Sequence, residues 1–463
     1  MIDALTNIVA ALNDRFLGYI LMAGLVFTGV YFTFASRFVQ FMRPTEMFRL
    51  ITGGTKKKGH ISSFQAFSIS TASRVGTGNI AGVAIAITTG GPGAIFWMWL
   101  IAVFGAASSF IESTLAQIYK VPTAGHFRGG PAYYMQNALG ARKLGAAFAV
   151  IITLTFAFIF NSVQSNTIAQ SLYHAFHFSP LMTGLCLAAL AGAIIFGGLR
   201  RIAKFSAIIV PVFALGYIAL TLFVMLLNLG KLPQVLALIF QDAFSLQKIT
   251  GGALGATIMV GARRGLFSNE AGMGSAPNAA ATANTSHPVK QGYVQAFGVF
   301  VDTLLICSCT AFIVLLSDYT ASCAQGIALT QFALTSEIGP AGNYFLVASI
   351  LLFAFTSIIG NYYYGQANVE FLTQNKTQML LFRAGVCGMI VLGAVAQLKL
   401  VWNLADLFMT VMALMNLYAL FRLRRQALDV LADYRRQKSA GKDPQFNPAD
   451  VPSVGQTRAW HLH

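Results

Sequence analysis

The chain has 463 residues, of which 56% are hydrophobic and only 10% are charged. A soluble protein of this size would carry about a quarter charged residues, so this chain cannot cover itself with a water-compatible surface. The formal net charge of +16 could indicate a nucleic-acid partner, but nucleic-acid binders place basic residues on an exposed face and have few long apolar runs. The composition excludes both classes and predicts an all-α polytopic membrane protein.

Eleven apolar windows follow along the chain, each about 20 residues long and able to cross a membrane as a helix. They begin near residues 17, 64, 93, 146, 181, 206, 251, 291, 342, 378 and 401. Cytoplasmic loops carry an excess of Lys and Arg. With the N-terminus outside, the segments expected inside hold 24 of the 31 basic residues. This asymmetry predicts a multi-pass protein of the plasma (inner) membrane, with its N-terminus outside and its C-terminus in the cytoplasm.

The second and seventh spans do not have the sequence of uninterrupted helices. The second combines glycines with polar residues at membrane depth: Ser73, Arg74, Gly76, Thr77, Gly78, Asn79 and Gly82. The seventh has the same combination: Gly261, Gly265, Ser268, Asn269, Glu270, Gly272, Gly274 and Pro277. Non-helical backbone at membrane depth is tolerated only where it lines a cavity or is buried in protein. Two breaks five spans apart indicate an inverted 5+5 repeat, which is typical of a secondary transporter with a site near the midplane.

Two other interpretations of these glycines are open. Glycine-rich spans are often close-packing faces between helices. The run from Gly76 to Gly82 also resembles a nucleotide loop, but its spacing is GxGxxxG and it follows no predicted strand. The repetition of the polar glycine break favours the transporter interpretation over both.

The spans and loops divide the chain into five parts. We expect an extra N-terminal span and a basic cytoplasmic loop (1–63), a first five-helix repeat (64–228), an extracellular connection (229–250), a second five-helix repeat (251–422) and a basic cytoplasmic tail (423–463). The tail begins with FRLRRQALDVLADYRRQK, which is typical of a basic amphipathic helix on the inner leaflet. Beyond about residue 438 it has no apolar period, so we expect disorder there.

Several long motifs resemble one known family. They are TASRVGTGNIAG, GGPGAIFWMWLIAVFGAASSFIESTLAQIYK, FRGGPAYYM, FNSVQSNT and RRGLFSNEAGMGSAPNAAATA. They resemble the alanine/glycine:cation symporter family, over about residues 60 to 420. The resemblance implies a LeuT-type fold with one extra N-terminal helix, and sodium- or proton-coupled uptake of small neutral amino acids.

The resemblance also implies roles for residues of both breaks. The first break would hold the α-carboxylate of the substrate with Gly76, Thr77, Gly78 and Asn79. The second would line the opposite side of the pocket with Phe267, Ser268, Asn269, Met273 and Gly274. On the fourth span, Asn161 and Gln164 are amides three residues apart, and so lie on one face. They could bind an amino or amide group of the substrate, or join two helices, and Met273 could equally be core packing.

A sodium site follows from the same resemblance. Thr356 and Ser357 on the ninth span resemble the hydroxyl pair that completes a sodium site with backbone carbonyls near Ala72 and Val75. Sodium is a hard cation that takes oxygen ligands. The alternative is that the two hydroxyls bond carbonyls of their own helix, as Ser and Thr often do in spans.

Asn361 and Arg74 are unusual positions. Alanine-preferring members of the family carry Trp where this chain has Asn361. An amide there enlarges the pocket and adds a donor and an acceptor, which favours glutamine over alanine or glycine. Arg74 is permanently charged and needs a partner in the membrane. We expect a charge brace with Glu270, with Glu112 and Asp302 as other candidates.

The sequence therefore predicts a sodium-coupled symporter that imports a small neutral amino acid by alternating access and needs no cofactor other than the coupling ion. Proton coupling is the alternative, with Glu270 or Asp302 as the relay. A membrane-embedded enzyme is disfavoured because all seven His lie in predicted loops or tails and neither HExxH nor GxSxG occurs. A channel would show a repeated filter. The expected partners are the amino acid and membrane lipid, without nucleic acid, and the protein is expected to work as a monomer.

Overall fold

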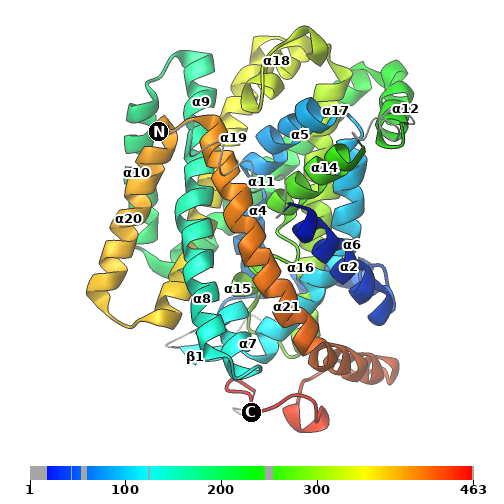
Figure 1. The fold of residues 1–463 in the computed structure, drawn as a ribbon, viewed down its shortest axis with the longest axis vertical. Coiled ribbons are helices and arrows are strands. Elements are labelled where there is room, and N and C mark those ends of the chain that lie inside the picture. The colour runs from blue at the N-terminus through cyan, green and yellow to red at the C-terminus, as the bar shows by residue number, and fades with distance from the viewer. Residues whose placement is uncertain (1–17, 43, 54–59, 124–125, 246–253, 461–463) are drawn as a thin grey trace.

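The structure is a computed structural model that describes residues 18–42, 44–53, 60–123, 126–245 and 254–460 (Figure 1). Its first half contains α2 (Gly18–Ala35), α3 (Pro44–Thr52), α4 (Ser63–Arg74), α5 (Val83–Gly90), α6 (Ala94–Ile118), α7 (Pro131–Asn137), α8 (Arg142–Ile152), α9 (Asn161–Phe176), α10 (Pro180–Ile195), α11 (Gly198–Leu227) and α12 (Leu232–Ala243). Its second half contains α14 (Leu254–Asn269), α15 (Ala276–Ala280), α16 (Pro288–Val299), α17 (Ser308–Leu316), α18 (Ile327–Ile338), α19 (Pro340–Leu372), α20 (Lys376–Val395) and α21 (Leu398–Ser439). Turns of π-helix, at 78–82, 153–160 and 300–307, join α5, α9 and α17 to the preceding segments.

The predicted class, an all-α polytopic membrane protein, is confirmed. In the described part of the chain, eight helices are long and apolar enough to cross a membrane, each near a predicted start. The other predicted spans correspond to α4 with α5, to the shorter apolar α10, and to α14 with α15. The predicted domain boundaries stay predictions, and residues 1–17 and 246–250 of the first and third parts lie outside the described residues.

One small sheet was not predicted. Strand β1 (Val121–Thr123) pairs antiparallel with β2 (His126–Arg128), with Val121 opposite Arg128. This hairpin follows the C-terminal end of α6 and leads into α7. Pairs this short have no apolar alternation that a sequence pattern could reveal.

Both predicted helix breaks are present. A capping box starts α4, in which the Ser62 side chain accepts from the backbone of Gln65 and the Gln65 side chain accepts from the backbone of Ser62. The helix ends at Arg74, and a π-helical turn over 78–82 leads into α5. The second break, between α14 and α15, contains three residues with positive φ: Glu270 (56°), Gly272 (81°) and Gly274 (85°). Glycine tolerates this backbone region without a Cβ clash, so the glycines of the second break shape its turn.

The helices form two packed groups that meet at the breaks. In one group, α6 packs against α14 and α16, and α14 packs against α5. In the other, α9 packs against α19 and α20, and α10 packs against α20 (Figure 1). Helix α4 packs against α19 of the second group and α16 of the first. The first break therefore lies where the two groups touch.

The expectation that the end of the tail is disordered was wrong. Residues beyond α21 pack against the helix ends at one end of the molecule, near α7 and the hairpin (Figure 1). Five of their apolar side chains are buried: Phe446, Val451, Val454, Ala459 and Trp460. Their spacing follows no helix or strand period, so the sequence pattern gave no sign that they are core residues.

Candidate transport site

The backbone amides of the first break point at side-chain oxygens. The Gly76 amide donates to Asn79 Oδ1 at 2.8 Å. The Thr77 amide and the Thr77 hydroxyl both donate to Gln164 Oε1, at 3.0 and 2.7 Å. Free amides at the start of a helical segment bind anions well. Gln164 Oε1 thus occupies a position that suits an oxygen of a carboxylate, and the structure brings the predicted residues Gly76, Thr77, Asn79 and Gln164 together.

Gly76 stands where no side chain fits. A Cβ at this position would lie 2.2 Å from Ser357 Oγ and 2.9 Å from Gln164 Oε1. A Cβ on Gly78 would lie 3.0 Å from the Phe267 ring and 3.1 Å from Ser268 Cα. Other elements approach the backbone closely at both predicted glycines, which explains why neither carries a side chain. The approach is closest at Gly76.

Oxygen atoms converge beside Gly76. The Ser357 hydroxyl lies 2.9 Å from the carbonyl oxygen of Ala72, 3.3 Å from that of Val75 and 3.0 Å from that of Phe353. One hydroxyl proton cannot serve three acceptors, so the site has more oxygens than protons, as a hard cation requires. Three of the four predicted sodium ligands meet here.

Thr356, the fourth predicted ligand, makes a different contact. Its hydroxyl donates to the carbonyl of Phe353 in its own helix, at 2.8 Å. Ser357 shares this acceptor, so the intrahelical alternative describes Thr356 in this structure and part of the bonding of Ser357.

A buried carboxylate joins the two breaks. Asn79 donates to Asp302 Oδ1 at 2.7 Å, and Ser268 donates to Asp302 Oδ2 at 2.8 Å. Thr303 also donates to Oδ2, at 2.9 Å. Asp302 was predicted only as a partner of Arg74 or a proton relay, although an acidic residue within an apolar span was the available signal.

A second carboxylate holds the second break. Glu112 on α6 accepts from the amides of Gly272 and Gly274, at 3.2 and 3.0 Å, and from the Asn416 amide group at 2.8 Å. Asn416 Nδ2 also donates to the Gly272 carbonyl at 2.9 Å. A Cβ on Gly274 would lie 2.7 Å from Pro131, 2.8 Å from Phe148 and 2.9 Å from Asn416. The predicted residue Gly274 therefore belongs to this brace, and neither Glu112 nor Asn416 was predicted in such a role.

The Ser73 hydroxyl lies between Asn361 and Glu270 of the second break. Ser73 Oγ lies 2.6 Å from both Glu270 Oε1 and Asn361 Oδ1, and Asn361 Nδ2 has no partner. A hydroxyl carries one proton. Ser73 therefore donates to only one of the two oxygens at a time. Ser275 also donates to Glu270 at 2.6 Å.

The predicted ion pair of Arg74 with Glu270 is not formed among the described residues. Arg74 instead donates to the carbonyl of Gln295 and to Ser109 Oγ, each at 3.3 Å. Glu270 accepts from two serine hydroxyls, as described above. Neutral oxygens around the guanidinium replace the direct pair, because α16 and α6 lie closer to Arg74 than the carboxylate does.

Aromatic rings close one side of the first break. Phe267 packs against Phe160 at a centroid distance of 4.5 Å and against Trp402 at 4.7 Å. The Arg264 guanidinium lies 4.6 Å from the Trp402 ring and pairs with Asp406. Phe267 was predicted, but Phe160 and Trp402 were not, because aromatic residues are common in spans and carry no positional signal.

The other predicted residues make local contacts. Asn161 Nδ2 donates to the Ala157 carbonyl of its own helical segment at 3.1 Å, and its Oδ1 has no partner. Asn269 donates to Thr303 Oγ1 at 3.2 Å and accepts from the Ala271 amide at 3.0 Å. Met273 is fully buried. Asn269 and Met273 therefore shape the second break, whereas Asn161 keeps an unused acceptor.

Two interrupted helices around a buried, oxygen-rich centre, set among long apolar helices, define a membrane transporter rather than an enzyme. The comparison with protein families agrees. The chain belongs to the sodium:alanine symporter family, whose model matches residues 2–448.

Curated relatives are similar over nearly their whole length. A Bacillus subtilis protein named probable sodium/glutamine symporter GlnT is 55% identical, over 96% of this chain and 94% of its own. The amino-acid carrier protein AlsT of the same organism is 50% identical, over 99% of this chain and 97% of its own. A third B. subtilis protein, the putative sodium/proton-dependent alanine carrier protein YrbD, is 43% identical, over 97% and 95%.

Proposed function

We propose that the protein is a sodium-coupled symporter that imports glutamine, and more weakly alanine and glycine, by alternating access. The observation that carries the proposal is the first break, where backbone amides bonded to side-chain oxygens lie beside a group of converging oxygens. Gln164 Oε1 lies on the Thr77 amide, and Ser357 Oγ lies between the carbonyls of Ala72 and Val75. An anion and a cation can bind next to each other there and stabilise each other.

The substrate carboxylate would replace Gln164 Oε1 at the amides of Gly76 and Thr77. Gln164 would then be free to accept from the substrate ammonium group. Sodium would take the oxygens of Ala72, Val75 and Ser357, together with Thr356 after a rotation of its hydroxyl. Because each ligand supplies charge to the other's site, sodium raises the affinity for the amino acid, which is the coupling that a symporter needs.

Glutamine is the proposed substrate because of the polar group opposite the carboxylate site. Asn361, Ser73 and Glu270 form a connected set of donors and acceptors, which suits a side-chain amide better than a methyl group. Phe267, with Phe160 and Trp402 beside it, would pack against the aliphatic part of the substrate. The name of GlnT supports this choice.

The remaining predicted substrate contacts keep a smaller role in the proposal. Gly78 leaves room for Phe267 and Ser268, and Asn79 and Ser268 are linked through Asp302. Asn161 offers its unpaired Oδ1 to the substrate ammonium group. Asn269, Met273 and Gly274 would hold the second break in shape rather than touch the amino acid.

We further propose that the protein works as a monomer in the plasma membrane, surrounded by lipid, with its N-terminus outside and its C-terminus in the cytoplasm. The distribution of Lys and Arg supports this orientation. One sodium ion entering down a potential of 100 mV supplies about 2.3 kcal/mol to transport, before any concentration gradient. Sodium coupling is therefore sufficient to drive uptake.

Proton coupling is the second candidate. Asp302 and Glu270 are buried carboxylates in contact with the two breaks, and YrbD is named for both cations. A proton on either carboxylate would loosen the hydrogen bonds that join the breaks. This mechanism predicts uptake that follows the pH gradient and persists without sodium.

Uptake of labelled glutamine, alanine and glycine into proteoliposomes distinguishes the candidates. Sodium is replaced by choline at constant pH, and an inward pH gradient is then imposed in the absence of sodium. The proposal predicts that uptake stops in choline and that acid outside does not restore it. Undiminished uptake in choline, driven by the pH gradient, would establish the proton mechanism instead.

A further inference from the structure

The chain after α21 forms a strap across one end of the molecule. Residues 440–460 contain a single short helical turn, Pro448–Asp450, and otherwise run without regular structure. Several of their apolar side chains are buried, Phe446 and Trp460 among them. A segment without regular hydrogen bonding keeps one path only if side-chain contacts hold it. Two groups of contacts do so.

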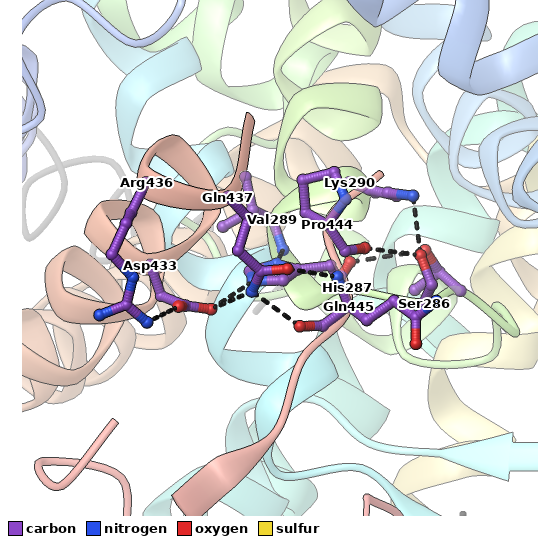
Figure 2. A network of polar contacts seen from close by, with 10 residues as sticks. Ser286, His287, Val289, Lys290, Asp433, Arg436, Gln437, Pro444 and Gln445 are labelled. Carbon is purple, nitrogen blue, oxygen red and sulfur yellow. Dashed lines mark hydrogen bonds and ion pairs between the residues drawn. The ribbon is translucent and has the colours of Figure 1, made fainter. Parts of the chain in front are cut away.

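The first group fastens the strap to the start of α16 (Figure 2). The Phe446 amide donates to the Ser286 carbonyl at 2.9 Å, and the Ser286 hydroxyl donates to the Pro444 carbonyl at 3.0 Å. Lys290 pairs with Asp443 at 2.6 Å. The loop between α15 and α16, which follows directly from the second break, is thus bonded to the strap through both backbone and side chains.

The same group includes the end of α21. Gln437 exchanges two hydrogen bonds with the backbone of Gln445, at 2.8 and 2.9 Å. Gln437 also donates to Asp433, which contacts His287 Nε2 at 3.2 Å (Figure 2). His287 caps α16 by accepting from the Val289 amide. Burial lowers the pKa of His287, so its neutral form is favoured in this network.

The second group fastens the strap to the end of α6 and to the hairpin. Trp460 Nε1 donates to the Gln117 carbonyl at 2.9 Å. The Lys120 ammonium lies between two rings, 4.7 Å from Trp460 and 4.2 Å from Phe127. Phe446 packs edge-on against Trp460 at 5.1 Å. This ring pair joins the two groups of contacts into one unit.

The Lys120 contact combines a favourable and an unfavourable contribution. Lys120 is buried, and burial lowers its pKa to about 7. The cation–ring contacts and the hydrogen bonds of Nζ to Gln117 Oε1 and the Ala283 carbonyl, at 2.7 and 3.0 Å, recover part of that cost.

One residue of the strap faces a hollow beside the second helix group. Arg458 lines a hollow of about 550 Å³ together with Glu370 of α19, Arg142 of α8 and Arg128 of β2. Arg128 and Glu370 form an ion pair at 2.9 Å. The strap therefore joins α6 and the start of α16 to the end of α21, which packs against α8 and against α9 of the second group. Separation of the two helix groups at this end would break contacts of the strap.

We propose that residues 440–460 are a latch that holds the inner ends of the two helix groups together and must release before the transporter opens to the cytoplasm. The inference rests on the alternating access and the orientation proposed above. The latch delays inward opening until ligand binding at the breaks favours it. Loss of the latch therefore increases the population of the inward-open state.

A cysteine reporter tests the latch without relying on transport. The exposed or half-buried native cysteines Cys186, Cys323 and Cys387 are replaced by Ser, and Ala276→Cys is added. Ala276 is fully buried at the start of α15. A membrane-impermeant maleimide is applied to the face of the membrane that the C-terminus occupies. Its labelling rate is compared for the parent, for Trp460→Ala and for a chain that ends after residue 439.

The expected result is labelling at least about fivefold faster in Trp460→Ala and in the shortened chain. Phe178→Ala is the matched control and should label at the parent rate. It removes an exposed ring from the loop before α10, far in sequence from the strap. Unchanged labelling in both latch variants would overturn the proposal. If only the shortened chain is misfolded, Trp460→Ala decides alone, with its thermal unfolding checked against the parent.

Uptake by the same proteins separates the two proposals. If the parent shows no sodium-dependent uptake, the proposed function fails, whatever the labelling shows. If the parent transports and the latch variants label no faster, only the latch fails.

Discussion

The two helix breaks look alike in sequence but are stabilised in different ways. At the first, neutral side chains satisfy the backbone amides, as when Gln164 accepts from Thr77. At the second, the Glu112 carboxylate accepts from two amides. Both oxygens of one carboxyl group thus tie Gly272 and Gly274 together. This side chain fixes the shape of the second break, and we infer that the separate partners of the first break are easier to replace.

The glycines show the same difference. The first break uses Gly76 to let Ser357 and Gln164 approach the backbone. The second uses Gly272 and Gly274 for positive φ angles. Substitutions in the first break should accordingly affect binding and coupling, and substitutions in the second should affect stability before they affect specificity.

The largest effect is expected from Gly76→Ala. Its Cβ would lie 2.2 Å from Ser357 Oγ, which displaces both proposed ligand sites at once. Uptake of glutamine should fall at least about 100-fold, measured in proteoliposomes with matched protein amounts. Gly388→Ala is the control, because a Cβ there meets no atom within 4 Å, and it should stay within about twofold of the parent. Normal uptake by Gly76→Ala would remove the first break from the site.

Glu112→Gln should destabilise the second break. The NH₂ group of Gln is a donor, and in either orientation it must face another donor, the amide of Gly272 or that of Gly274. The free energy of unfolding should fall by about 2 to 4 kcal/mol. Thermal unfolding in detergent measures this loss. Asp429→Asn, in a long 3.7 Å pair on the surface of α21, is the control. Equal unfolding temperatures for Glu112→Gln and the parent would contradict the brace.

Ser357→Ala should act on sodium specifically. Removal of one of the converging oxygens should raise the sodium concentration for half-maximal uptake about tenfold, with a smaller change in maximal rate. Ser349→Ala is the control. Ser349 lies on the same helix, and its hydroxyl donates to the carbonyl of Phe345. The control should keep the sodium dependence of the parent, and an unchanged dependence in Ser357→Ala would argue against this sodium site.

The smallest effect is expected from Asn361→Trp, which should lower the ratio of glutamine to alanine uptake about fivefold. The indole would fill the space next to Ser73 and remove the amide. Asn361→Leu keeps a smaller volume and also lacks the amide, so it separates size from polarity. If both variants keep the parent ratio, Asn361 does not select the substrate.

Much of the fold could be predicted from the sequence, because span length and loop charge are local properties. The breaks were also visible, since Gly76 and Gly272 stand beside polar residues in apolar spans. The partner of Glu112 was not predictable, because Asn416 lies 304 residues away. A charge in a span indicates that a partner exists but does not identify it.

The differences between prediction and structure have the same cause. Arg74 and Glu270 were paired by opposite charge, but Ser109 and Gln295 lie within reach of the guanidinium instead. Trp460 and Phe446 were placed in a disordered end because they are isolated apolar residues. Each of these outcomes depends on tertiary neighbours, which a pattern along the chain does not contain.

The most direct test of the account is calorimetric binding of glutamine to the purified protein at increasing sodium concentrations, for the parent and for Ser357→Ala. The account predicts that sodium increases glutamine affinity in the parent and that Ser357→Ala loses most of this increase. Glutamine affinity that is independent of sodium in the parent would contradict the proposal that the first break binds both ligands together.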